Sequence, residues 1–430
     1  MISEVRAVTI VTADLERARR LYAGLLGMRE VAAYRLEGDE GAAVARRWAL
    51  PSDTPLAIAC LEQPGARSGA VRLVRFESGN PPAITDGART YDHGYVKNLD
   101  FFTDDVPGAY ERFVAAGERF LAPPVTYPLS WGSRVTATEA HLPTPDGVKV
   151  SLAGMSRVPR RAFGESSRDA AFTEVAAATQ IVSDYDAAVR FYARVFDCVP
   201  AAETVVDDAG LVAALGLPPE TRLRMSFIGP PAAVGGKVGL VAYEGPRVAD
   251  SRSLSAHAAP SARGVRVMTF ETDDVDRRHA LALLNGAAEI APPADGLVPP
   301  LGRVRTSSFR SPDGAVLEIY DPSPAAAFVP VLDAGDVTEG RLTVVARPEV
   351  GRVALTRIAG AVVALEDRCP HLGAPLSAGT VTGRRVVCPW HGWVIDLATA
   401  KVEGGEGVAA RPCAARVIGG QVCLRKRDSA

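Results

Sequence analysis

The stretch TADLERARRLY at residues 12–22 returns as VSDYDAAVRFY at residues 182–192, with the same spacing between its acid and its tyrosine. The offset between the two copies, from residue 12 to residue 182, is 170. Two further pairs stand at offsets of 169 and 167: FTDDV at 102–106 with ETDDV at 271–275, and PDG at 145–147 with PDG at 312–314. Self-similarity at a nearly constant offset is the signature of an internal repeat. The sequence therefore predicts a tandem duplication of residues 1–155 and 172–322.

Each half of this duplication is predicted to contain two smaller units. A unit opens with an apolar strand, and the four such runs are Val5–Val11, Val96–Phe102, Glu174–Val182 and Val265–Phe270. An aspartate follows each strand, where its carboxylate can accept hydrogen bonds from the free N–H groups at the start of a helix. Apolar residues at spacings of three and four then indicate the helix, as at Val189, Tyr192 and Phe196. The Pro-Asp-Gly triplets are typical turn residues, and a short apolar run follows each of them.

A βαβββ unit repeated four times resembles the vicinal oxygen chelate superfamily, which includes glyoxalase I, bleomycin-resistance proteins and extradiol dioxygenases. The resemblance covers about the first 320 residues. It implies an α+β fold in which two domains, 1–155 and 172–322, each hold two units. It also implies that paired units curl their sheets into an open cup around a ligand cavity. An unrelated repeat of ferredoxin-like units is the alternative interpretation.

The same resemblance indicates where a divalent metal would bind in the cups, since the family usually uses His on the opening strands and Glu on the closing strand. Such ligands suit Fe(II) or Zn(II). The opening-strand positions, seven residues before each capping aspartate, are Ala7, Asn98, Ala177 and Val267, and none of them is a strong ligand. The closing-strand positions are Ser151 and Glu318, so only Glu318 keeps a ligating side chain. We therefore expect cups without a metal, with an additional Fe(II) as the alternative.

Two histidines of the repeat region are candidates for a catalytic role beside Glu318. His141 lies on a predicted strand near Glu139, so its ring can point into a cup. His93 lies in a predicted loop and can face a cavity. Each is a candidate atypical metal ligand or general base, and a purely structural role is the alternative. His279 lies inside a predicted helix and is expected at the surface.

The C-terminal region has a different character and carries the strongest motif. After a Pro- and Ala-rich linker at 322–327, short apolar runs alternate with Gly, Asp and Pro turns, as in a small all-β domain. Within this region stand Cys369-x-His371, sixteen intervening residues, and Cys388-x-x-His391. One thiolate and one imidazole from each of two tight turns suit an iron–sulfur cluster or a structural zinc site with two Cys and two His.

This motif, with a proline after each cysteine and a glycine after the second histidine, resembles the Rieske [2Fe–2S] signature over residues 328–427. The resemblance implies that Cys369 and Cys388 bind one iron and that His371 and His391 bind the other. High-potential Rieske proteins join the two loops by a disulfide, but the matching positions here are Ala374 and Trp390. Trp393 also replaces a hydroxyl residue that often donates a hydrogen bond to the cluster. These departures predict a potential toward the low end of the Rieske range, about −150 mV.

Composition excludes several other classes of function. The 430 residues contain 48 Lys and Arg against 50 Asp and Glu, so no basic surplus is present to neutralise a nucleic acid. No apolar run is long enough to span a bilayer, and the N-terminus carries no secretory signal, so we expect a cytoplasmic chain without a membrane partner. No Gly-rich nucleotide-binding motif follows a strand, so NAD(P)H or flavin is expected on a separate reductase.

Together these features predict a Rieske iron–sulfur oxidoreductase that couples electron transfer to the oxygenase-type oxidation of a small, aromatic or hydrophobic substrate in the cups. Aromatic residues near the predicted cavities are Trp48, Tyr91, Tyr95, Phe120 and Trp131. The alternative is a non-catalytic, ferredoxin-like electron carrier whose cups only bind a ligand or dock an oxygenase or reductase. A metal-independent isomerase or lyase with a structural cluster is a third interpretation. The sequence leaves a homo-oligomeric state open.

Overall fold

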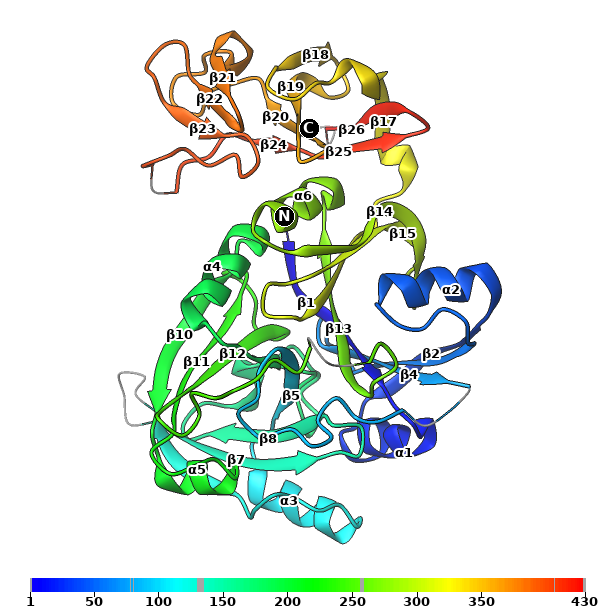
Figure 1. The fold of residues 1–430 in the computed structure, drawn as a ribbon, viewed down its shortest axis with the longest axis vertical. Coiled ribbons are helices and arrows are strands. Elements are labelled where there is room, and N and C mark those ends of the chain that lie inside the picture. Colours follow the sequence, from blue (N-terminus) through cyan, green and yellow to red (C-terminus); the bar gives the residue numbers. More distant parts are fainter. Residues whose placement is uncertain are drawn as a thin grey trace.

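The computed structural model describes residues 2–77, 79, 81–129, 135–255, 259–405 and 407–427. Four βαβββ units follow one another along the first three quarters of the chain, and a small all-β domain follows them (Figure 1). Unit 1 consists of β1 (Ile2–Val11), α1 (Leu15–Arg19) with a π-helical extension (Arg20–Leu25), β2 (Arg29–Leu36), α2 (Gly38–Arg47), β3 (Leu56–Glu62) and β4 (Ala70–Phe76). Unit 2 consists of β5 (Tyr95–Phe102), α3 (Val106–Ala115), β6 (Val125–Leu129), β7 (Val135–Pro143) and β8 (Lys149–Met155).

Units 3 and 4 repeat this order of elements. Unit 3 consists of β9 (Ala177–Ile181), α4 (Tyr185–Phe196), β10 (Val199–Val206), α5 (Ala209–Ala214), β11 (Arg222–Gly229) and β12 (Lys237–Glu244). Unit 4 consists of β13 (Gly264–Thr272), α6 (Val275–Leu284), β14 (Ala288–Val298), β15 (Gly302–Arg310) and β16 (Val316–Asp321). The predicted repeat of strand, capped helix and strands is confirmed.

The aspartates that precede the helices cap them as predicted. Asp14, Asp105, Asp184 and Asp274 each accept a hydrogen bond from the backbone N–H three residues later. Each cap satisfies an N–H group that has no partner within the helix. Gly147 and Gly314 of the two Pro-Asp-Gly turns have φ of 73° and 91°, a conformation that glycine adopts without steric cost.

The units pair across the two halves of the sequence repeat. One eight-stranded sheet has the order β14-β15-β16-β13-β1-β4-β3-β2, and it joins unit 4 to unit 1 through an antiparallel β1/β13 pair. The other has the order β10-β11-β12-β9-β5-β8-β7-β6, and it joins unit 3 to unit 2 through β5/β9. We call the concave sides of these sheets the 1–4 cup and the 2–3 cup. The segments 1–155 and 172–322 describe the repeat in the sequence, and each sheet takes strands from both.

The helices divide between the two sides of the sheets. Residues of α1, α3, α4 and α6 join strand residues of both sheets in one continuous apolar core. The helices α2 and α5, which are insertions after the second strand of units 1 and 3, instead fill the cups. Val44, Ala45 and Trp48 at α2 pack against the inner face of the 1–4 sheet, and Leu211 and Val212 of α5 pack into the 2–3 cup.

The C-terminal domain lies against α6 (Figure 1). Its strands are β17 (Phe328–Asp333), β18 (Thr343–Arg347), β19 (Gly351–Ile358), β20 (Ala361–Glu366), β21 (Thr380–Thr382), β22 (Arg385–Val387), β23 (Val394–Asp396), β24 (Pro412–Cys413), β25 (Ala415–Ile418) and β26 (Gln421–Arg425). They form three small sheets, β17-β26-β25, β18-β19-β20-β24 and β21-β22-β23.

Polar contacts fix this domain to the repeat region. Asp321 at the end of β16 is buried and accepts hydrogen bonds from Arg416 at 2.7 Å and Arg425 at 2.9 Å. Arg277 of α6 donates to the carbonyl of Ala398 at 2.8 Å.

The expectation of an exposed His279 is wrong, because this residue packs against strands β14 and β15 of its own unit. Its ring is buried against Phe309, and its Nε2 lies 2.8 Å from a carboxylate oxygen of Glu289.

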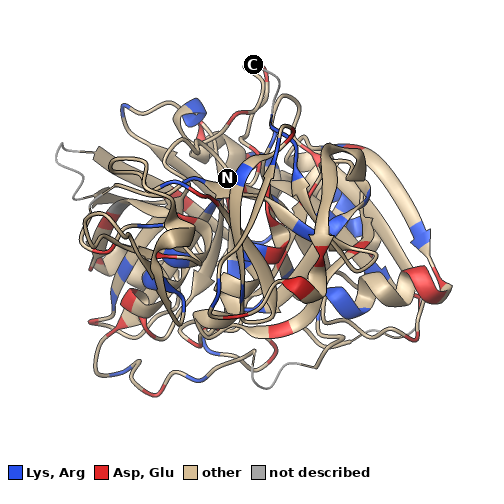
Figure 2. Cartoon of the chain, turned by 90° about the horizontal axis from the view of Figure 1, so that it is seen from above, with Lys and Arg blue, Asp and Glu red and all other residues tan. Residues whose placement is uncertain are grey.

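The charges of the chain are evenly mixed. Basic and acidic segments are interspersed across the view in Figure 2, in line with the net charge of −2. No helix of the described residues is long and apolar enough to cross a membrane.

Candidate functional site

Two loops of the C-terminal domain have the same backbone design. In the first, which follows β20, the N–H of Cys369 donates to the carbonyl of Ala374 at 2.7 Å, and the N–H of Gly373 donates back to the carbonyl of Cys369 at 3.0 Å. In the second, which follows β22, Cys388 makes the corresponding bonds with Trp393 at 2.8 Å and Gly392 at 3.0 Å. Both glycines have positive φ, 79° and 69°, which lets each loop close tightly. The sequence therefore builds two equal turns, each with a cysteine at its start.

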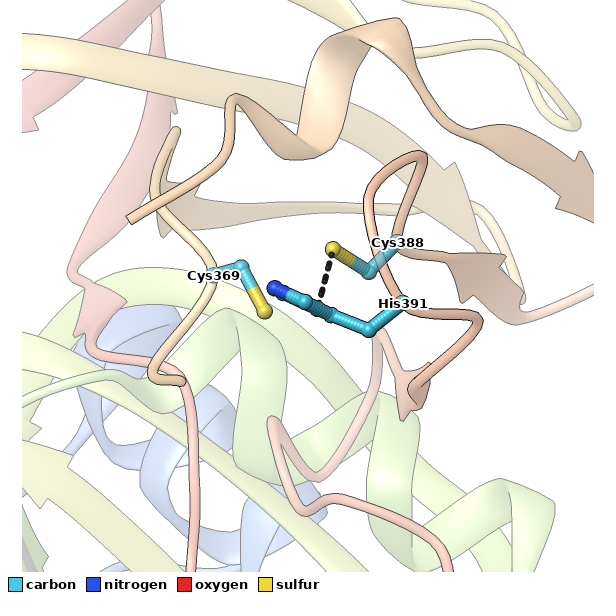
Figure 3. A group of neighbouring side chains, drawn as sticks. All are labelled: Cys369, Cys388 and His391. Atoms are coloured by element: carbon cyan, nitrogen blue, oxygen red, sulfur yellow. Dashed lines mark hydrogen bonds between the residues drawn. The ribbon is translucent and has the colours of Figure 1, made fainter. Parts of the chain in front are cut away.

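These loops face each other and bring three side chains together. Cys369 projects from one loop, and Cys388 and His391 project from the other (Figure 3). One ligand atom from each of these residues lies within 4.8 Å of the other two. The Sγ of Cys388 is 3.4 Å from the Nδ1 of His391, while the buried Nε2 of His391 has no hydrogen-bond partner. Among the described residues, no other three His, Cys, Asp or Glu side chains converge in this way.

The fourth motif residue, His371, lies beside this group. Its ring centroid is 4.3 Å from that of His391 and 4.5 Å from that of Trp393, on which it stacks with an interplanar angle of 15°. His371 is exposed, and the two cysteines are buried. One side of the group is therefore enclosed by protein, and its histidine side faces solvent.

This donor set fits a [2Fe–2S] cluster with mixed ligands. Burial raises the pKa of the Cys369 thiol, and so does the neighbouring Cys388, so two adjacent thiolates require a nearby positive charge. Iron supplies that charge, since a thiol that coordinates a metal is deprotonated. His391, whose Nε2 has no hydrogen-bond partner, adds an imidazole to the two thiols, as a Rieske cluster requires.

Glu318 lies at the centre of the 1–4 cup and is completely buried. Its Oε1 accepts hydrogen bonds from Arg47 at 2.7 Å and from the indole of Trp48 at 3.0 Å. Its Oε2 accepts from Arg72 at 3.2 Å and from Thr269 at 3.0 Å. Burial acts to raise the pKa of Glu318, but the two guanidinium groups outweigh it and hold the pKa below its usual value. A metal ion at this carboxylate would have to displace two buried arginines.

His141 lies in the other cup, in a different kind of cluster. Its Nδ1 is 3.0 Å from the hydroxyl of Ser151, and its Nε2 is 3.2 Å from a carboxylate oxygen of Glu139. Glu139 also accepts a hydrogen bond from Tyr127 at 2.8 Å. Asp100, on β5, pairs with Ser151 of β8 and accepts a hydrogen bond from Thr179 at 2.6 Å. Burial raises the pKa of Asp100 to about 7 against the effect of that bond.

His93 lies in neither cup. It belongs to the connection between units 1 and 2, where its Nδ1 is 2.7 Å from the hydroxyl of Ser251 in the connection between units 3 and 4. Its backbone N–H and carbonyl also bond to Arg252 and Leu254. Burial lowers the pKa of His93. Glu318, His141 and His93 are therefore in three different places, and the structure does not bring them together.

Sequence reasoning missed the buried lysines of the 2–3 cup. Lys97 and Lys149 line a cavity of about 180 Å³. Burial lowers the pKa of Lys149 to about 8, and burial together with Lys149 lowers that of Lys97 well below its usual value. The only sign of them in the sequence was that each lysine stands within a run that is otherwise largely apolar.

The predicted aromatic residues have different outcomes. Trp48 is a buried partner of Glu318, Tyr95 lines two cavities, and Trp131 lies outside the described residues.

Comparisons with known proteins identify the family. A family model described as Glyoxalase/Bleomycin resistance protein/Dioxygenase superfamily matches residues 5–152 and 174–319, more than half of the chain. A second, described as Rieske [2Fe-2S] domain, matches residues 327–415. The chain therefore belongs to the Glyoxalase/Bleomycin resistance protein/Dioxygenase superfamily and carries a C-terminal Rieske [2Fe-2S] domain, which binds a [2Fe–2S] cluster.

The curated relatives match one short segment each. Apoptosis-inducing factor 3 of Mus musculus is 41% identical over 58 residues, 14% of this chain and 10% of that protein. The vanillate O-demethylase oxygenase subunit of a Pseudomonas strain is 46% identical over 65 residues, 14% of this chain and 20% of that protein. The match thus spans a fifth or less of either relative. The crystal structure of glyoxalase I from Zea mays is 16% identical with a TM-score of 0.48, and it covers 74% of this chain and 92% of that one.

Proposed function

We propose that this chain is a Rieske iron–sulfur oxidoreductase in which Cys369, His371, Cys388 and His391 hold the cluster. Electrons from the cluster serve the oxygenase-type oxidation of a small aromatic or hydrophobic molecule bound in the cups. The observation that carries the proposal is the convergence of Cys369, Cys388 and His391 from two equal loops. A cluster with His ligands on one iron supplies one-electron transfer at a higher potential than a cluster with four cysteines. The likeness of this segment to an oxygenase subunit supports the oxygenase class.

The packing of the Rieske domain favours the 1–4 cup as the place of oxidation. The helix α6 belongs to unit 4 and contacts β14, β15 and β16 of that sheet on one side and β20 of the Rieske domain on the other. Leu281 of α6 shares a core with Cys369 and Cys388. One helix and one sheet therefore separate the cluster from the interior of this cup.

Electrons have to reach the cluster from a separate protein, and the solvent side of the two loops is suited to such a contact. Leu372 and Trp390 are each 62% exposed although both are large and apolar. They follow His371 and precede His391 directly, so a partner that covers them lies against the histidine side of the cluster. Exposed apolar side chains that cluster together commonly mark protein contacts.

An electron carrier without catalysis is the second candidate, and the state of Glu318 favours it. All four of its hydrogen bonds come from protein groups, so the residue at the family's metal position is already engaged. In such a carrier, the cups bind a ligand or dock an oxygenase or reductase.

One experiment separates the two candidates. The full chain, reduced with dithionite, is mixed with oxygen in the presence and absence of aromatic compounds, and oxygen consumption and product are measured. The enzyme hypothesis predicts consumption that depends on one class of compound and is lost in His391→Ala but kept in the control His93→Gln. The carrier hypothesis predicts that a one-electron acceptor such as cytochrome c oxidises the reduced cluster. It also predicts that none of the aromatic compounds changes the rate of oxygen consumption. Purified protein that lacks iron and labile sulfide would contradict both hypotheses.

A further inference from the structure

A cavity of about 420 Å³ opens at the rim of the 1–4 cup. The end of α2, the starts of β5, β13 and β16 and the end of β15 surround it. Much of its wall is apolar, with Leu50, Ile84, Ile290 and Val316 among the lining residues. Cavities of this size accommodate small organic molecules. The cavity lies beside the residues around Glu318 and does not include them.

Arg266 reaches this cavity through an irregularity in the sheet. Thr9 pairs with Val267 and the next residue, Ile10, pairs with Val265, so Arg266 is the extra residue of a β-bulge. A bulge redirects a side chain from the regular alternation of the strand. The side chain of Arg266 lines the cavity, although the residue is only 8% exposed. The fold therefore holds a basic group in a buried place.

Within the described part of the chain, Arg266 has no counter-charge. Its side chain makes no hydrogen bond and no ion pair, and its buried Nε is without a partner. None of the described residues that line the cavity is acidic. Burial, together with the neighbouring Arg310, lowers the pKa of Arg266 to about 10, so the guanidinium stays charged at neutral pH. A buried, unpaired charge is costly unless an opposite charge is supplied.

A second arginine lies at the same end of the cavity. Arg310 donates one hydrogen bond, to the carbonyl of Gly314 at 3.0 Å, and has no acidic partner among the described residues. Burial lowers its pKa as well. Arg46, which is exposed, is the third arginine in the lining, and none of the described lining residues carries a carboxylate.

The equivalent position in unit 2 shows that the fold does not require an unpaired cation at this place. Lys97 stands 169 residues before Arg266, the offset of the sequence repeat, and it is also the extra residue of a bulge, between Val96 and Asn98. It lines the smaller cavity near Gly147, as Arg266 lines the larger one near Gly314. Lys97 donates a hydrogen bond to the carbonyl of Thr90, so the chain itself satisfies it. Arg266 has no such internal partner.

We propose that the cavity at the rim of the 1–4 cup binds an organic carboxylate with an apolar body, whose carboxylate pairs with Arg266 and Arg310. The planar guanidinium matches a carboxylate with two parallel hydrogen bonds. The apolar body contacts Leu50, Ile290 and Val316. This binding does not depend on the redox function proposed above, because it needs no electron transfer.

Calorimetric titration of the oxidised full-length protein with 1-naphthoate tests the proposal, with the neutral 1-naphthamide and with 1-naphthyl phosphate as comparison ligands. We expect one naphthoate per chain and binding of the amide at least tenfold weaker. Arg266→Met and, independently, Arg310→Gln are expected to weaken naphthoate binding at least tenfold, and Arg266→Lys to retain part of it. The exposed Arg29→Met is the matched control and is expected to bind as the original protein does.

Several results would overturn the proposal. They are the absence of naphthoate binding, equal binding of acid and amide, tighter binding of the phosphate, or unchanged affinity in both Arg266→Met and Arg310→Gln. The cluster absorbance and the unfolding temperature of each variant show whether it is folded. Because titration precedes any reduction, a negative result leaves the redox proposal standing, and a protein without oxygenase activity can still bind naphthoate.

Discussion

The 1–4 cup and the 2–3 cup are built from equivalent strands, but their buried carboxylates have different hydrogen-bond donors. In the 1–4 cup, Thr9 pairs with Arg72 and Thr269 pairs with Glu318 across the parallel strands. At the equivalent places of the 2–3 cup, Thr179 pairs with Gly239, and Asp100 pairs with Ser151. The carboxylate of the 1–4 cup accepts four hydrogen bonds, two of them from arginines, whereas Asp100 has a threonine as its donor.

Because of this difference, the carboxylate of one cup stays ionised at neutral pH, whereas that of the other cup gains or loses a proton near neutral pH. Arginines hold the pKa of Glu318 below its usual value, so this carboxylate is ionised at neutral pH. Burial with few donors raises that of Asp100 to about 7, and a neighbouring Lys149 has its pKa lowered to about 8. The carboxylates stand on different strands of the unit, since Glu318 corresponds to Ser151 and Asp100 to Thr269. The same cup can therefore hold a structural ion pair in one copy and a group poised to exchange protons in the other.

Removing the charge of Glu318 is expected to have the largest effect. Glu318→Gln leaves Arg47 and Arg72 buried without a counter-ion, which we expect to lower the free energy of unfolding by about 3–5 kcal/mol. Chemical denaturation followed by tryptophan fluorescence measures this change. The control is Ser151→Ala at the equivalent position, where the loss of the contact to His141 should cost about 1 kcal/mol. Equal losses in the two variants would contradict the comparison.

Removing the charge of Asp100 is expected to have a smaller effect that depends on pH. Because its pKa in the folded protein, about 7, is above the ordinary value of 3.8, the original protein loses stability as the pH rises from about 4 to about 7. Asp100→Asn has no such loss. Relative to the original protein it should gain up to roughly 4 kcal/mol over this range, at about 1.4 kcal/mol per pKa unit. Unfolding curves at several pH values test this, and parallel pH profiles for the two proteins would refute it.

Loss of a single hydrogen bond should lower the free energy of unfolding less when the carboxylate has more donors. Tyr127→Phe removes the hydrogen bond that Tyr127 donates to Glu139, and we expect a loss of about 1.5–3 kcal/mol, typical of a bond to a charged group. Thr269→Val removes one of four donors to Glu318, and a loss of about 1 kcal/mol is expected. Denaturation midpoints of both variants give the ranking, and a larger loss in Thr269→Val would reverse the interpretation.

Much of this architecture is predictable because it depends on local signals. The helix caps at Asp14 and Asp184, the Pro-Asp-Gly turns and the Cys-x-His and Cys-x-x-His spacings each act within a few residues. The repetition of the caps and turns at a nearly constant offset predicted the duplication, the strand and helix pattern predicted two units in each half, and the family match agrees with both.

The remaining features depend on contacts between distant segments. Every unit has the same pattern, so the sequence could not indicate that β1 pairs with β13 and β5 with β9. Nor could it indicate that Arg47 and Arg72, on unit 1, would meet Glu318 of unit 4. Nor could it indicate that His279 would lie on the side of α6 that packs against Phe309 of β15 and Glu289 of β14.

The central claim is that the iron of this protein resides in one cluster held by the two loops, while arginines occupy the metal position of the 1–4 cup. Quantification of iron, zinc and labile sulfide in anaerobically purified protein, combined with electron paramagnetic resonance after reduction, tests it most directly. We predict two irons and two sulfides per chain, all accounted for by a Rieske-type signal that disappears in Cys388→Ser and persists in Glu318→Gln. A third iron that is lost in Glu318→Gln, or stoichiometric zinc without sulfide, would contradict the claim.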